Sequence, residues 1–310
     1  YGWLTNRLSG ICEDGNAMNG VCNDIGRAAF VGRISNGRGN MKSVLFYVNE
    51  DSGFDARYQA ALDLARALDG HLHCLRVNSY QPQMAYDGVS GMSVFYDFSK
   101  YADEVDAQLK AETEKRLAGE DVPWDYRQAN AEPARGLSRN AALADIMVLS
   151  SGSARKDSRQ ALRLLGDVIF STNVPVVIQP DSVKKFAANG PVIVAWNGSF
   201  EAGNALRAAV PLLKLASDVH IVVVEEDKDH DLPPLDASEY LSRYGIKSQI
   251  HDLAADQSSV QAVLLSTVDT LQASYMVMGA YGHSRAREFL FGGVTRNLFR
   301  DCPVPLVVAH

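Results

Sequence analysis

The chain has 310 residues, which is long enough for two domains of ordinary size. Its composition, 46% hydrophobic and 22% charged, is that of a soluble globular protein. No apolar run approaches the roughly 18 residues of a membrane-spanning helix. The formal net charge of -7 argues against a broad nucleic-acid-binding surface. Four cysteines without CxxC pairs or metal-ligand spacing favour a reduced, cytoplasmic protein.

Residues 1–40 differ from the rest of the chain. They contain eight glycines and six asparagines, show no long apolar face, and lack the continuous apolar core of a secretory signal. We expect them to form a flexible or non-native extension that carries no chemistry.

The remainder alternates short apolar runs with segments whose apolar residues recur at helical spacing. In the first half we expect strands at 44–48, 72–77, 125–128, 146–149 and 174–178, and helices at 54–68, 102–118, 134–143 and 159–170. A polar insertion is expected at 78–101 and a linker at 181–190. In the second half we expect strands at 192–196, 219–224, 247–251, 276–278 and 304–308, and helices at 200–216, 237–244, 258–272 and 294–300.

The two halves are repeats. Ser43-Val-Leu-Phe-Tyr-Val-Asn49 precedes the first helix of one half as Pro191-Val-Ile-Val-Ala-Trp-Asn197 precedes that of the other. Near the ends, Val-Pro-Val-Val-Ile parallels Val-Pro-Leu-Val-Val. Strands that alternate with helices form parallel sheets through right-handed crossovers. We therefore predict an α/β protein with two repeated open parallel five-stranded sheets and helices on both faces, in domains 41–180 and 191–310.

A glycine-containing loop follows the strand that ends at Met278. Gly279 and Gly282 are followed, after nine residues, by Gly292, Gly293 and a predicted helix. Glycines let the backbone approach an anion closely, and a helix amino end favours negative charge. Three arginines, at 285, 287 and 296, make the stretch locally positive. The pattern predicts a phosphate-binding loop, although it matches neither the Walker nor the Rossmann fingerprint.

This spacing resembles the nucleotide-binding loop of the universal stress protein family, Gly-x2-Gly-x9-Gly-Ser/Thr, and the repeat resembles the tandem type of that family over residues 41–310. The resemblance implies an adenine nucleotide alpha-hydrolase-like, Rossmann-related fold that binds ATP or a related adenine nucleotide, with or without Mg2+, in the second domain. The binding residues it implies are Ala195, Asn197, Val224, Met278, Gly279, Gly282, His283, Arg285, Gly292, Gly293, Val294 and Thr295.

Two positions depart from the family pattern. Gly293 stands where the family has Ser or Thr, and Thr295 supplies the nearest hydroxyl. Asn197 stands where Asp is usual, and its amide can still bond a ribose hydroxyl. Ser199 fits either ligand binding or a helix N-cap.

The first half departs further from the family pattern. When the halves are aligned on their Val-Pro strands, Leu162 and Arg163 stand opposite Gly292 and Gly293. Side chains at these two positions should block the approach of a phosphate. We therefore expect a degenerate nucleotide loop and a mainly structural first domain.

The sequence predicts no catalytic residues and no metal site. No nucleophile–base pair, metal cluster or carboxylate pair stands at a suitable position, so we expect at most slow ATP hydrolysis. His71 and His73 share a strand face, but the sequence places no third metal ligand beside them.

By resemblance, the protein is expected to be a stress-response regulatory or protective protein with paired domains and a homodimeric assembly. Three alternatives stay open. They are a nucleotide-independent interaction scaffold, an ATP-hydrolysing or adenylating enzyme that uses His283 or Asp157, and a regulatory module for a membrane transporter.

Overall fold

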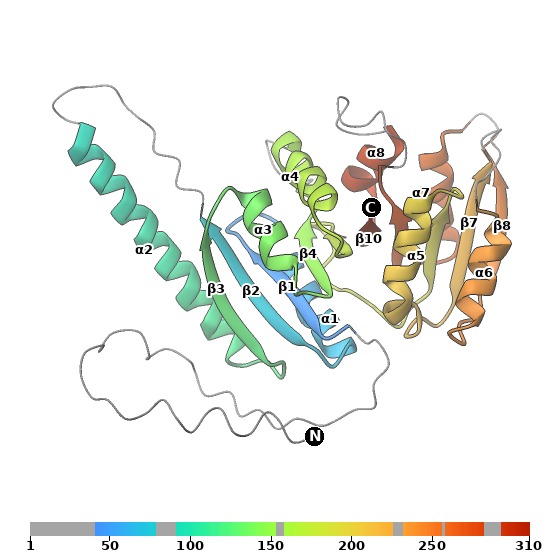
Figure 1. Cartoon of the computed structure of the whole chain (residues 1–310), viewed down its shortest axis with the longest axis horizontal. Helices are drawn as coiled ribbons and strands as arrows, with labels where there is room; N and C mark the ends of the chain where they lie inside the picture. The colour runs from blue at the N-terminus through green and yellow to red at the C-terminus, as the bar shows by residue number, and fades with distance from the viewer. Residues whose placement is uncertain (1–40, 79–90, 153–157, 226–231, 256–257, 282–292) are drawn as a thin grey trace, which may run out of the picture. The chain divides into compact units, whose positions relative to one another are not determined.

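A computed structural model describes residues 41–310 except 79–90, 153–157, 226–231, 256–257 and 282–292 (Figure 1). Residues 1–40, the predicted extension, lie outside the described residues, as do residues 79–90 of the predicted insertion. Among the described residues, none of the helices combines the length and the apolar character needed to cross a bilayer.

Strands and helices alternate along both halves, as the sequence pattern predicts. The first half contains β1 Ser43–Val48, α1 Phe54–Ala67, β2 His71–Asn78, α2 Gly91–Leu117, β3 Trp124–Asn130, α3 Pro133–Ala141, β4 Ile146–Ser150, α4 Ser158–Ser171 and β5 Val176–Gln179. The second half contains β6 Val192–Trp196, α5 Phe200–Leu213, β7 Val219–Glu225, α6 Pro234–Ser242, β8 Gln249–Ala254, α7 Val260–Thr270, β9 Tyr275–Gly279, α8 Gly293–Asp301 and β10 Leu306–Ala309.

The predicted boundaries differ from the observed ones by up to three residues except at α2, where the error is larger. The helix expected to begin at residue 102 begins at Gly91, so residues 91–101 are helical rather than part of the insertion loop. Their mixture of aromatic and polar residues shows little helical periodicity. Residues 102–117 form a strongly helical segment directly after them. Extending an existing helix fixes only one residue for each new hydrogen bond, so this helix can continue toward its amino end through residues 91–101.

The strands form one ten-stranded sheet in the order β3-β2-β1-β4-β5-β10-β9-β6-β7-β8. Pairing is parallel within each half, which confirms the predicted α/β class. At the centre, β5 and β10 pair antiparallel, with Val177 opposite Val307. Because β10 is flanked by β9 and β5, it is not an edge strand, and the outer edges of the sheet are β3 and β8.

Each face of the sheet carries one continuous apolar layer. Helices α1, α2, α5 and α6 supply buried residues to one cluster, which also contains Phe46, Val194 and Val307. Helices α3, α4, α7 and α8 supply the other, which includes Met147 and Met276. In the first half, Figure 1 shows α3 in front of the strands and α1 behind them. Burial on both faces explains why the central strands are nearly uninterrupted apolar runs.

The predicted linker contains neither a helix nor a strand, yet it is packed against both halves. Phe186 is 3% exposed. Its backbone N–H donates to Asp63 Oδ2 of α1 at 2.9 Å. Its ring lies 5.1 Å from the ring of Tyr275 in β9. This residue therefore connects the core of the first half to that of the second.

We expect Phe186→Ala to lower the free energy of unfolding by about 3–5 kcal/mol, since the truncation leaves a cavity between the two halves. Denaturant-induced unfolding of the nucleotide-free protein measures the effect. Phe200→Ala is the matched control, because that side chain is 68% exposed and its loss should change stability by no more than about 0.5 kcal/mol. Equal effects of the two substitutions would show that the segment is a passive tether.

Candidate functional site

Each half has a topological switch point. There, two adjacent central strands are followed by helices that pack on opposite faces of the sheet. These points lie between β1 and β4 in the first half and between β6 and β9 in the second. In open parallel sheets, ligands bind outside the carboxyl ends of the strands at such points. The residues at the two switch points are therefore the ones to compare between the halves.

In the first half a buried arginine fills the switch point. Arg57, on α1, is 1% exposed. It donates from Nε to the carbonyl of Tyr47 and from Nη2 to the carbonyl of Asn49, both at 2.8 Å. Its Nη1 donates to Asp51 Oδ1 at 3.1 Å and also contacts Ser150 Oγ at the end of β4. The guanidinium thus connects the ends of the two strands between which a ligand would bind.

A second arginine completes this network. Arg76, on β2, donates to Asn49 Oδ1 at 2.9 Å and pairs with Asp106 of α2 at 3.0 Å. The amide of Asn49 in turn donates to Asp51 Oδ2 at 2.7 Å. Asn49 is the counterpart of Asn197, and both its amide oxygen and its amide nitrogen take part in this network.

The second half lacks both members of the Arg57–Ser150 pair. Helices α1 and α5 begin alike, with Phe-Asp-Ala-Arg57 and Phe-Glu-Ala-Gly203, so Gly203 takes the place of Arg57. The strand registers place Gly279 where Ser150 stands. Among the described residues, a methyl group added at Gly203 would meet Leu232 alone, at 3.5 Å. The switch point of the second half is therefore not filled by the corresponding arginine.

Gly279 has a packing role of its own. A Cβ there would lie 2.4 Å from the backbone nitrogen of Ala202 and 2.5 Å from the carbonyl carbon of Glu201. Only glycine lets the end of β9 pack this closely against the first turn of α5. This contact explains the residue without a ligand, and its predicted role in nucleotide binding stays a prediction.

Three of the predicted binding residues share one face of the sheet. Ala195 lies beside Met278 in the register of β6 and β9, and Val224 lies near the end of the adjacent strand, β7. All three pack with the apolar cluster on the side of α7 and α8. They form an apolar surface near the carboxyl ends of three neighbouring strands.

The loop after β6 is organised by hydrogen bonds between nearby residues. Ser199 Oγ accepts from the backbone N–H of Ala202 at 3.2 Å, which confirms the N-cap interpretation of this serine. Asn197 Oδ1 accepts from the backbone N–H of Ser199 at 3.2 Å and from its hydroxyl at 2.8 Å. The exposed Asn197 side chain is thus held in position over the start of α5.

The remaining predicted residues lie at the start of α8 or outside the described part of the chain. Gly293 is the first residue of α8, and a Cβ built on it meets no described residue within 4 Å. Val294 and Thr295 follow in the first turn, which contains no acidic residue. This helix amino end suits an anion. Gly282, His283, Arg285 and Gly292 are not among the described residues.

Sequence reasoning missed Tyr281, which fixes the direction of the chain after β9. Its φ of 67° is in the left-handed region, where the first half has Gly152 with φ 65°. The conformation is unfavourable for an aromatic residue. It is held by packing, with the Tyr281 ring 4.2 Å from that of Phe170 and 6.3 Å from that of Phe299. Burial raises the pKa of the Tyr281 hydroxyl well above its usual value.

Comparisons with known proteins agree with this architecture. The model of the universal stress protein family matches residues 189–310. The universal stress protein Slr1230 from Synechocystis is 24% identical over 299 residues, a match that covers 86% of this chain and 99% of that protein. The alignment therefore includes both halves.

Solved structures extend the likeness in fold. A universal stress protein from Archaeoglobus fulgidus matches with a TM-score of 0.64 at 19% identity, over 86% of this chain and 95% of its own. A protein from Pseudomonas aeruginosa, described as a putative universal stress protein, matches with a TM-score of 0.53 at 13% identity, over 87% of this chain and 93% of its own. The chain is thus similar to universal stress proteins, in its second half through the family model at residues 189–310 and over both halves through the Synechocystis relative.

Proposed function

We propose that this chain is a universal stress protein that binds ATP or a related adenine nucleotide at the switch point between β6 and β9 of its second domain. The contrast between Arg57 and Gly203 carries the proposal. One half fills its switch point with a buried guanidinium, whereas the other places a glycine at the same helical position. A binding site is expected where the described residues place no side chain like that of Arg57.

The described residues offer suitable chemistry for each part of a nucleotide. The apolar surface formed by Ala195, Val224 and Met278 suits an adenine ring. Asn197, held beside it, suits a ribose hydroxyl. The open position in front of Gly293, at the amino end of α8, suits a phosphate. Gly282, His283, Arg285 and Gly292 complete the proposed phosphate loop from outside the described residues.

We further propose that nucleotide occupancy regulates a protective or signalling role in the cytoplasm during stress. The two described cysteines, Cys74 and Cys302, are buried free thiols, which suits a reducing compartment. The resemblance also implies a homodimer. Since β5 already pairs with β10 in the same chain, a second copy would have to associate through another surface.

We expect Gly293→Val to weaken ATP binding at least about 10-fold without loss of stability. The new side chain enters space that the described residues leave empty, so we expect it to interfere with a phosphate there. Calorimetric titration with Mg-ATP measures the affinity, and thermal unfolding without nucleotide measures the stability. The wild-type protein should bind one nucleotide per chain, after co-purified nucleotide has been removed.

Arg163→Val is the matched control for this substitution. Arg163 is the counterpart of Gly293 in the first half, and its side chain is 74% exposed. The control should bind ATP as the wild type does. Two nucleotides per chain would contradict the assignment to the second half alone. No binding at millimolar ATP would leave the nucleotide-independent scaffold as the better description.

A second prediction transfers the filling residue from one half to the other. We expect Gly203→Arg to abolish measurable ATP binding, because a guanidinium at this position would reach the ends of β6 and β9 as Arg57 reaches those of β1 and β4. Gly203→Ala should bind ATP normally, since among the described residues its methyl group makes just one contact, of ordinary length, with Leu232. Undiminished ATP binding by a folded Gly203→Arg protein would show that the nucleotide lies elsewhere.

A further inference from the structure

The structure brings a third polar side chain to the two histidines of β2. His71 and His73 point to the same face of the sheet, two residues apart on β2. The neighbouring strand, β3, places Asp125 directly opposite His73. Within the described part of the chain, this is the single group of three His, Cys, Asp or Glu side chains whose ligand atoms lie within 4.8 Å of one another.

The three side chains converge on one point. His71 Nε2 lies 2.9 Å from Asp125 Oδ1, and His73 Nδ1 contacts the same oxygen. The two imidazole rings are 4.6 Å apart. Ligand atoms bound at about 2.1 Å to a tetrahedral ion lie about 3.4 Å from one another, so small side-chain rotations would suffice to bind a metal.

We propose that His71, His73 and Asp125 form a binding site for a divalent transition-metal ion, with zinc as the ion that fits best. Two imidazoles and one carboxylate are a donor set typical of such ions. The set provides three ligands, which leaves at least one position for water or an exogenous ligand. The side chains are 30–37% exposed, so an ion can reach them from solvent.

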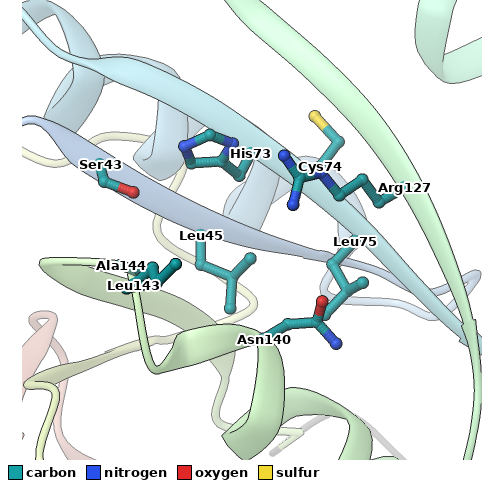
Figure 2. Close-up of a pocket in the computed structure, with 9 residues that line it drawn as sticks. All are labelled: Ser43, Leu45, His73, Cys74, Leu75, Arg127, Asn140, Leu143 and Ala144. Carbon is teal, nitrogen blue, oxygen red and sulfur yellow. The ribbon is translucent and has the colours of Figure 1, made fainter. Parts of the chain in front are cut away.

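The surroundings hold the carboxylate in place and leave room beside it. Arg127 donates from Nε to Asp125 Oδ2 at 2.9 Å, so the other carboxylate oxygen remains directed at the histidines. Such outer contacts orient metal ligands in known sites. Figure 2 shows His73 and Arg127 at a pocket of about 180 Å³, whose wall includes Leu45 and Asn140. An anionic ligand of the metal could bind there beside the guanidinium.

The site is separate from the proposed nucleotide site. His71 and Asp125 lie at the amino-terminal ends of β2 and β3, whereas the switch points lie at the carboxyl ends of the central strands. The metal site also belongs to the first half. The proposal therefore goes beyond the proposed function and does not depend on it.

The second half provides an internal comparison. The strand registers place Asp218, His220 and Gln249 at the positions of His71, His73 and Asp125. His220 Nδ1 lies 3.0 Å from His251 Nε2, but the carboxylate opposite His73 is replaced there by the amide of Gln249. The fold therefore accepts several polar side chains at these positions and does not itself require the two-histidine, one-carboxylate set.

The alternative is a hydrogen-bonded cluster without a metal, in which Asp125 Oδ1 accepts from both imidazoles. This arrangement satisfies the side chains but predicts no affinity for an ion. Metal titration separates the two interpretations.

The experiment is calorimetric titration of the full chain with Zn2+ near neutral pH, after treatment with a chelator and buffer exchange. We expect one ion per chain for the wild-type protein. Asp125→Asn, which preserves the shape of the side chain, should weaken binding at least about 10-fold. His73→Gln should abolish saturable binding. Far-UV circular dichroism checks that both variants remain folded.

His251→Gln is the matched control, because it alters a histidine of the second-half pair and should leave Zn2+ affinity unchanged. The absorption spectrum of the Co2+ form should lack a thiolate charge-transfer band, which excludes binding by the cysteines of the chain. Affinity that is insensitive to Asp125→Asn and His73→Gln, or equally weakened by His251→Gln, would overturn the proposal. Absence of saturable binding to the wild type would favour the hydrogen-bonded cluster.

Discussion

The antiparallel pairing of β5 with β10 is the constraint on which the rest of the described structure depends. It joins two parallel five-stranded units into one sheet and places an apolar layer on each face that runs through both halves. It also takes up the strand edge that each unit would otherwise expose, an arrangement that limits unwanted pairing with other chains. The packing of Phe186 against Tyr275 adds to the same junction from the linker.

Within this shared frame, single side chains distinguish the two switch points. Arg57 is buried and its guanidinium is bonded to strand ends and to Asp51, whose charge it compensates. Removing either partner of a buried ion pair leaves an uncompensated buried charge. Each of the two side chains, Arg57 and Asp51, therefore needs the other in this site. In the second half, where Gly203 and Gly279 take these positions, the described residues show no comparable network. Function can therefore differ between repeats while the backbone stays the same.

The sequence was sufficient to predict the alternation of strands and helices, because burial on both faces produces continuous apolar strands and clear helical periodicity. It failed at the start of α2, where residues 91–101 lack that periodicity. It also missed the role of Arg57, since Ser150 is 93 residues away and meets it only through the parallel pairing of β1 with β4. Asp125 was missed for the same reason, because the register of β3 against β2 is set by tertiary packing.

The positions shared by the two repeats suggest how such a chain can divide its chemistry. At the carboxyl ends of the strands, the first half satisfies its polar groups internally through Arg57 and Arg76, which leaves little for a ligand to bind. At the amino-terminal ends, it instead presents two imidazoles and a carboxylate to solvent, where the second half has a histidine pair and an amide. A buried polar group that is already hydrogen-bonded gains little binding energy from a ligand. Partly exposed side chains that converge on one point can instead exchange their mutual hydrogen bonds for bonds to a metal ion. The same physical criterion therefore underlies both the proposed nucleotide site in the second half and the proposed metal site in the first.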